Sequence, residues 1–147
     1  MHAPLLAIVV PCYNEQEVLP ETAKRLREVL LAMKEKGKVE ERSFILFVND
    51  GSKDSTWEDI KALRAADPVN YAGLSFAANR GHQFAVMAGL EEAQRMHVDA
   101  TISIDADLQD DITVIEQMVD KYRDGAEIVY GVRKKRNTDT FFKRVSA

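Results

Sequence analysis

Short apolar runs rich in β-branched residues alternate with segments of helical periodicity along almost the whole chain. The five apolar runs cover residues 5–10, 43–49, 71–76, 100–105 and 126–132. Between these runs apolar residues recur every three or four positions, as Leu19, Ala23 and Leu26 do, a spacing typical of amphipathic helices. Strands that are apolar throughout and alternate with helices predict an α/β fold, with a mainly parallel sheet covered by helices on both faces.

Four helices are expected between these strands, over about residues 19–37, 56–66, 82–97 and 112–125. Pro20 suits the first turn of the first helix. Asp54 or Ser55 is the expected N-cap of the second, because short polar side chains can accept hydrogen bonds from free N–H groups there. Residues 138–147 resemble the start of a further element.

Length, composition and charge narrow the classes of protein further. At 147 residues with 46% hydrophobic content, the chain is expected to fold as one domain around a core. The net charge of −4 argues against general nucleic-acid binding. Cys12 is the single cysteine, so no internal disulfide forms, and packing is favoured over nucleophilic chemistry. Without an apolar run of membrane-spanning length, the chain as given is expected to be soluble.

The candidate functional residues follow the expected strands, because ligands of open parallel sheets bind beyond the carboxyl ends of the strands. The fourth strand runs directly into Asp105 and Asp107. Hard divalent cations such as Mg²⁺ and Mn²⁺ take carboxylate and phosphate oxygens as ligands, so this pair predicts a metal that bridges the protein to a diphosphate. For Asp110 and Asp111, a role as caps of the next helix is at least as good an interpretation as a role in ligand binding.

The other strand ends carry weaker signals with structural alternatives. Asp50 is placed to accept hydrogen bonds from a ligand, although Asp-Gly-Ser also suits a simple turn. His82 is more simply a helix-start or solvated residue than a catalytic group. The chain contains no Gly-x-Gly-x-x-Gly, P-loop or Gly-x-Ser-x-Gly motif, which removes support for dinucleotide oxidoreductases, P-loop NTPases and serine hydrolases. Of the functions considered, metal-assisted chemistry on a phosphorylated ligand is the one that these motifs still support.

Taken together, the strand-end motifs resemble the family 2 glycosyltransferases with the GT-A fold. The similarity is strongest to the polyprenyl-phosphate branch, which contains dolichol-phosphate mannose synthases and bacterial undecaprenyl-phosphate (bactoprenol) glucosyltransferases. The motifs that carry this resemblance are Val9-Val10-Pro11-Cys12-Tyr13-Asn14-Glu15, Val48-Asn49-Asp50-Gly51-Ser52-Lys53-Asp54, Asn79-Arg80-Gly81-His82-Gln83, Asp105-Ala106-Asp107-Leu108-Gln109-Asp110 and Val129-Tyr130-Gly131-Val132-Arg133.

This resemblance implies a role for each site residue. Asp107 and Gln109 would hold Mg²⁺ or Mn²⁺ on the diphosphate, and Arg133 would contact donor or acceptor phosphate, so that Asp107 and Arg133 are the candidate catalytic residues. The base and ribose of a nucleotide-sugar, UDP- or GDP-linked, would be held by residues from three strand ends: Pro11, Tyr13, Glu15, Asp50, Asp105 and Ala106.

The resemblance also implies an inverting transfer of a hexose to a polyprenyl phosphate. Relatives continue beyond this length, so residues 1–132 are expected to form the nucleotide-sugar-binding core. Residues 133–147, with a charge of +5, are expected to be a basic segment that leads into a C-terminal part and touches a membrane surface. The full-length protein is then expected at the cytoplasmic face of the inner membrane. Two alternatives stay open: a sugar or protein hydroxyl as acceptor, and a nucleotide-binding fragment inactive by itself.

Overall fold

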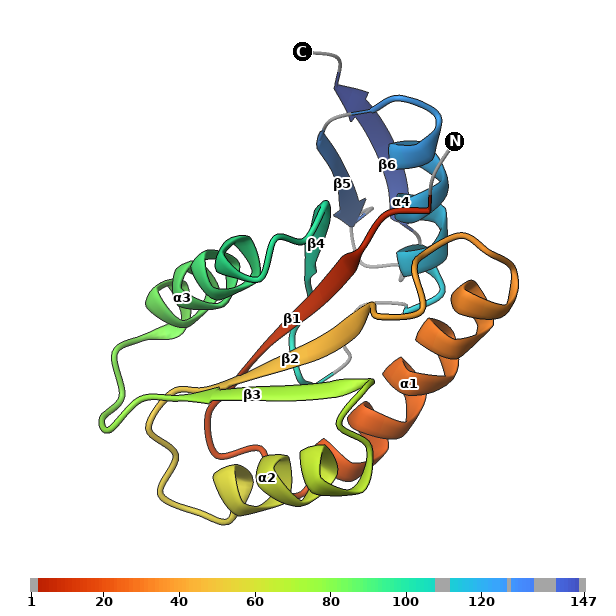
Figure 1. The fold of residues 1–147 in the computed structure, drawn as a ribbon. Coiled ribbons are helices and arrows are strands. Elements are labelled where there is room, and N and C mark those ends of the chain that lie inside the picture. Colours follow the sequence, from red (N-terminus) through yellow and green to blue (C-terminus); the bar gives the residue numbers. More distant parts are fainter. Residues whose placement is uncertain (1–2, 108–111, 127, 134–139, 146–147) are drawn as a thin grey trace.

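The computed structural model describes residues 3–107, 112–126, 128–133 and 140–145. Strands and helices alternate along the first 123 residues, as the sequence pattern predicts (Figure 1). The elements in chain order are β1 (Leu6–Cys12), α1 (Leu19–Glu35), β2 (Phe44–Asn49), α2 (Thr56–Ala66), β3 (Tyr71–Ser75), α3 (His82–Arg95), β4 (Ala100–Ser103), α4 (Val114–Arg123), β5 (Ile128–Arg133) and β6 (Thr140–Val145).

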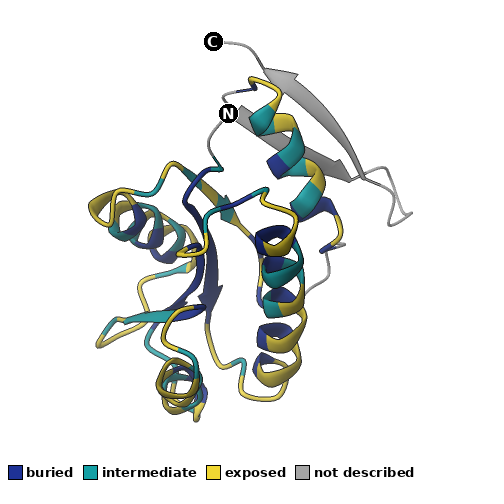
Figure 2. Cartoon of the chain, turned by 45° about the vertical axis from the view of Figure 1, so that its right-hand side comes forward, coloured by how far each residue is buried: buried dark blue, intermediate teal, exposed yellow. Residues whose placement is uncertain are grey.

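The first four strands form one parallel sheet in the order β3-β2-β1-β4. Strand β1 lies inside this sheet and pairs with β2 through Val9 and Leu46, and with β4 through Ile8 and Ile102. Every residue of β1 and β2 is buried, and both strands are dark blue in Figure 2. The parallel order places the carboxyl ends of all four strands at one edge of the sheet.

The two faces of the sheet are covered unequally. Leu6, Ile8 and Val10 of β1 point into a core that includes apolar residues of α1, α2 and α4. Ala7 and Val9 point to the opposite face, where α3 is the helix that packs against the sheet among the described parts of the chain. Figure 1 shows α3 on one side of the sheet and α1 with α2 on the other. The β3 edge of the α3 face is therefore only partly covered.

The fifth expected strand forms, but it does not extend the parallel sheet. Strand β5 pairs antiparallel with β6 in a separate two-stranded sheet, with Arg133 opposite Thr140. Strand β6 corresponds to the further element expected over residues 138–147. The division of the chain at residue 132 stays a prediction. None of the helices in the described ranges combines the length and the apolar composition that a bilayer crossing requires.

Helix α3 reaches the sheet closely because it carries a glycine where it crosses β1 and β2. A Cβ atom at Gly89 would lie 2.4 Å from Cγ1 of Val9 and 3.0 Å from Cγ2 of Val48. Both valines are fully buried, so neither can move away without disturbing the sheet. The helix can keep its present distance from the sheet only with glycine at this position.

We expect Gly89→Ala to lower the free energy of unfolding by about 1–3 kcal/mol, measured by urea denaturation, because overpacking a close-packed core forces backbone shifts. Helix propensity alone acts in the opposite direction, since alanine is favoured over glycine by about 1 kcal/mol. Gln94→Ala, at an exposed position of the same helix, is the control and is expected to change stability by less than about 0.5 kcal/mol. A stabilised Gly89→Ala variant would contradict the close contact.

Candidate functional site

The loops that follow β1 and β2 are fastened to each other by side-chain to backbone hydrogen bonds. The backbone N–H of Asn14 donates to Oγ of Ser52, and the backbone N–H of Lys53 donates to Oδ1 of Asn14, both at 2.9 Å. The backbone N–H of Glu15 donates to Oγ1 of Thr56 at 2.9 Å. Asn14 has a φ of +52°, in the left-handed region that asparagine tolerates better than most residues. These bonds fix the position of Glu15 at the strand edge.

At the start of α2, the side chain of Asp54 accepts a hydrogen bond from a backbone N–H group, whereas Ser55 holds the N-cap position without a capping side-chain bond. The Asp54 carboxylate accepts the backbone N–H of Thr56 at 2.9 Å. The same carboxylate accepts the backbone N–H of Gln16 at 3.3 Å. Burial opposes ionisation of Asp54, but the hydrogen bonds from Thr56 and Gln16 outweigh it and hold the pKa of Asp54 below its usual range.

The buried carboxylate of Asp50 holds the loop that follows β3. Its Oδ1 accepts the backbone N–H of Arg80 at 2.6 Å, and its Oδ2 accepts the backbone N–H of Gly81 at 3.0 Å. Asp50 is only 3% exposed. Gly51, with a φ of +65°, leaves room for this loop, since a Cβ there would lie 2.3 Å from the carbonyl carbon of Ala78. The Asp50-Gly51 pair thus fastens two strand ends together.

The end of β4 brings two of the predicted carboxylates to the same edge. Asp105 and Asp107 are exposed, and Ala106 between them is buried. The carbonyl oxygen of Ala106 accepts a hydrogen bond of 2.5 Å from the hydroxyl of Thr22 in α1. This bond turns Ala106 inward and leaves its acidic neighbours on the outside. Nε2 of His82, the first residue of α3, lies 3.5 Å from Oδ1 of Asp105.

The acidic residues at these strand ends influence one another electrostatically. The pKa of Glu15 is raised, first by burial and then by the negative charges of Asp107, Asp54 and Asp105, against a hydrogen bond from the backbone of Tyr13. Such an effect requires the carboxylates to lie near one another. We call these four acidic residues (Glu15, Asp54, Asp105 and Asp107) the strand-end cluster.

The donor atoms of the strand-end cluster are of the kind that Mg²⁺ or Mn²⁺ binds, because both are hard cations that take oxygen ligands. Within the described ranges, no three His, Cys, Asp or Glu side chains are arranged to hold a metal ion by themselves. Gln109, the second predicted ligand, lies outside these ranges. The donor atoms are thus of the right kind for a cation, but the described side chains do not complete a metal site by themselves, and a bound diphosphate would have to supply further oxygens.

The remaining predicted residues have different surroundings. Pro11 is buried in β1 beside Val48 of β2, and Tyr13 is exposed at the end of that strand. Arg133 ends β5, but its side chain lies outside the described part of the structure. Cys12 is buried, and burial followed by the charge of Glu15 raises the pKa of its thiol. A thiol held in its neutral form agrees with packing rather than with nucleophilic chemistry.

Two contributions to this edge were missed in the sequence. The first is the hydroxyl of Thr22. In the sequence Thr22 is a polar residue within an amphipathic helix, and its spacing does not indicate a hydrogen bond to Ala106, 84 residues away. The second is the use of the Arg80 and Gly81 backbone amides as partners of Asp50. The sequence Asp50-Gly51 predicts a turn or a contact with a ligand. A hydrogen bond from Asp50 to a different loop cannot be predicted from this sequence, because it depends on where that loop lies in the folded protein.

Comparison with known proteins identifies the family. Residues 7–146 match the model of glycosyl transferase family 2. The chain belongs to this family. The GT-A-type fold is confirmed by a solved structure, the mannosyltransferase PcManGT from Pyrobaculum calidifontis in complex with GDP-Man and Mn²⁺. It has a TM-score of 0.59 and 19% identity, and the match covers 73% of this chain and 28% of that protein.

Individual relatives agree with the resemblance to the bactoprenol branch. An uncharacterized glycosyltransferase of Bacillus subtilis, YkoT, is 54% identical over 98% of this chain and 42% of its own length. The bactoprenol glucosyl transferase of Shigella phage SfV is 42% identical over 97% of this chain and 43% of its own length. The present chain therefore spans about two fifths of the length of these relatives, and the expectation of a glycosyltransferase is confirmed at the level of the family.

We expect Asp50→Asn to loosen the loop after β3, because the amide NH2 that replaces one of the two carboxylate oxygens is itself a donor and would face a backbone N–H donor. Hydrogen bonds to a charged group contribute about 1.5–3 kcal/mol, so we expect a loss of this order in urea denaturation. The amide protons of Arg80 and Gly81 are expected to exchange faster with deuterium. Glu17→Gln, an exposed change in the neighbouring loop, serves as the control, and unchanged exchange at both amides would show that the two bonds do not hold the loop.

We expect Glu15→Gln to stabilise the metal-free protein at pH 7. A carboxyl group whose pKa is raised in the folded state favours folding when protonated, and this stability is lost as the pH rises through the raised pKa. Removing the charge should therefore raise the free energy of unfolding by on the order of 0.5 kcal/mol at pH 7, given the partial exposure of Glu15. The gain should vanish below pH ~4, where glutamic acid is neutral in either state. A gain independent of pH, or a gain equal to that of Glu17→Gln, would argue against the strand-end cluster.

Proposed function

We propose that this protein transfers a hexose from a nucleotide-sugar to a polyprenyl phosphate with the help of a divalent cation. The observation that carries the proposal is the position of Glu15, Asp105 and Asp107 after the carboxyl ends of β1 and β4, the edge where parallel sheets bind ligands. These residues occur in a family 2 chain whose relatives include bactoprenol glucosyl transferases. A nucleotide-sugar donor and a divalent metal also agree with the fold shared with a mannosyltransferase solved with GDP-Man and Mn²⁺.

The donor would bind across the three strand ends. Tyr13 offers an exposed aromatic ring for the base, beside the buried Pro11. Glu15 and Asp105 offer acceptors to base or ribose hydroxyl groups, with Ala106 against the same pocket. Asp50 uses one lone pair of each oxygen on Arg80 and Gly81, so a contact with the nucleotide would have to use the remaining lone pairs.

The metal would be held by Asp107 in the described part of the chain and by Gln109 outside it. When bound, the cation supplies charge neutralisation on the departing diphosphate, which is worth several kcal/mol as Lewis-acid assistance. The protein's own part is to hold the two phosphates beside the strand-end cluster. The exposed position of Asp107, next to an Ala106 fixed by Thr22, suits this task.

The acceptor phosphate would attack the anomeric carbon with one of its oxygens. A bond forms from that oxygen to the carbon, the bond from the carbon to the diphosphate breaks, and the electron pair leaves with the nucleoside diphosphate. Attack from the opposite side inverts the configuration. A phosphate monoester has a second pKa near 6 and is largely ionised at neutral pH, so no strong general base is needed. Arg133 is proposed to bind this phosphate.

Membrane association is a further part of the proposal. Residues 133–147 carry a net charge of +5, and each basic residue near an anionic leaflet contributes about 1 kcal/mol. A polyprenyl phosphate is itself anchored in the membrane. The longer protein would then work at the cytoplasmic face of the inner membrane, with this domain beside the lipid surface.

We expect Asp107→Ala to reduce Mn²⁺-dependent binding of UDP or GDP by at least tenfold in titration calorimetry, equivalent to about 1.4 kcal/mol, because it removes a metal ligand. Binding measured without Mn²⁺ should change little. Glu17→Ala, an exposed change outside the strand-end cluster, is the matched control. Unchanged affinity of Asp107→Ala in the presence of Mn²⁺ would remove the metal assignment.

The acceptor is tested separately with the longer protein. Transfer to a hydroxyl acceptor but not to a polyprenyl phosphate would favour the alternative in which a sugar or protein hydroxyl is the acceptor.

A further inference from the structure

The start of α3 brings a histidine to the carboxyl end of β4. Helix α3 packs over β1 and β2 in the middle of the sheet, so its first residue, His82, lies near the end of the neighbouring strand. Nε2 of His82 is 3.5 Å from Oδ1 of Asp105. The two side chains are 62% and 57% exposed, so a ligand can reach both. This contact joins α3 to one carboxylate of the strand-end cluster.

The loop before α3 holds this histidine in place. Asp50 accepts the backbone N–H groups of Arg80 and Gly81, the two residues that precede His82. Gly81 is the N-cap residue of α3 and has a φ of +103°, which glycine adopts with little strain. Its carbonyl oxygen accepts the backbone N–H of Ala85 at 3.0 Å. The buried carboxylate of Asp50 thus fixes the helix start that carries His82.

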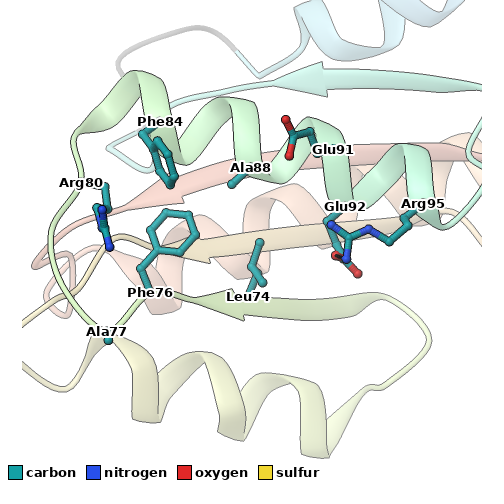
Figure 3. A pocket seen from close by; sticks show the side chains of 9 residues that line it. All are labelled: Leu74, Phe76, Ala77, Arg80, Phe84, Ala88, Glu91, Glu92 and Arg95. Carbon is teal, nitrogen blue, oxygen red and sulfur yellow. Dashed lines mark ion pairs between the residues drawn. The ribbon is translucent and has the colours of Figure 1, made fainter.

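Arg80, the other basic residue at the start of α3, faces the opposite side of the helix. Its guanidinium lies 6.0 Å from the centre of the Phe84 ring, and both side chains line a cavity of about 420 Å³ between α3 and β3 (Figure 3). Strand β3 forms one edge of the parallel sheet, whereas Asp105 follows β4 at the other edge. Of the two basic residues, His82 is therefore the one that contacts the strand-end cluster.

We propose that His82 is a positioning residue for the donor, which holds Asp105 so that its carboxylate accepts a hydrogen bond from a ribose hydroxyl of the nucleotide. This inference rests on the proposed function and narrows the role of Asp105 to the ribose. A carboxylate contacted at Oδ1 still offers Oδ2 as an acceptor, and a side chain already held in its bound orientation loses less entropy on binding. A donor beside Asp105 also offsets part of the repulsion among the carboxylates of the cluster.

The test compares Mn²⁺-dependent binding of UDP or GDP with binding of its 2′,3′-dideoxy counterpart by titration calorimetry. The ratio of the two affinities measures what the ribose hydroxyls contribute. We expect the wild-type protein to prefer the ribonucleotide about tenfold, and His82→Ala to lower this preference about threefold, because contacts between exposed side chains are weak. His82→Gln should restore the preference, since the glutamine amide also donates a hydrogen bond. Gln83→Ala, an exposed change at the next position, is the control and should leave the ratio unchanged.

Asp105→Ala provides the second comparison. In this background His82→Ala should not change the ratio further, because His82 acts through Asp105. An equal ratio in the wild-type protein and His82→Ala, or the same fall in the Asp105→Ala background, would overturn the role of His82, while intact Mn²⁺-dependent binding of UDP or GDP would leave the proposed function standing. A wild-type protein that binds the ribonucleotide and its dideoxy counterpart equally would also overturn this role alone. Absence of Mn²⁺-dependent binding by the wild-type protein would overturn both.

Discussion

The parallel pairing of β1 with both β2 and β4 is the constraint on which the rest of this structure depends. Because β1 is buried on both faces, helices must lie on both sides of the sheet, and the parallel strands need crossover connections, which are helices here. Every strand therefore runs in the same direction and ends at the same edge. Residues far apart in the sequence, such as Glu15 and Asp107, meet there for this reason.

The alternation of apolar runs and helical segments was enough to predict this part of the fold. It predicted the four parallel strands and the four helices, with α2 beginning at Thr56 as observed. The fourth helix is shorter than the expected 112–125: α4 covers Val114–Arg123, and its N-cap is Thr113 rather than Asp111. The position of β5 was not predictable in the same way. An apolar run such as residues 126–132 indicates that a strand forms, but which strand it pairs with depends on the tertiary arrangement. A sequence pattern holds no information about which edge a strand joins.

The candidate site was predictable in its residues but not in its bonds. Asp105 and Asp107 stand out because they directly follow an apolar run that predicts a strand, and the raised pKa of Glu15 reflects their charges. The bonds from Asp50 to the amides of Arg80 and Gly81 connect residues 30 and 31 positions apart. Such a bond depends on where two loops come to lie after folding. A single carboxylate in the sequence does not reveal whether it will face a ligand or a neighbouring loop.

The concentration of acidic side chains at one edge has a consequence for how an anion can approach. Glu15, Asp54, Asp105 and Asp107 create a negative electrostatic field around the proposed pocket. A free nucleoside diphosphate would be repelled by this field, whereas a diphosphate already complexed with a divalent cation carries less net charge. The association rate of the donor should then follow the concentration of the cation complex, and added salt, which screens such fields, should lessen the difference.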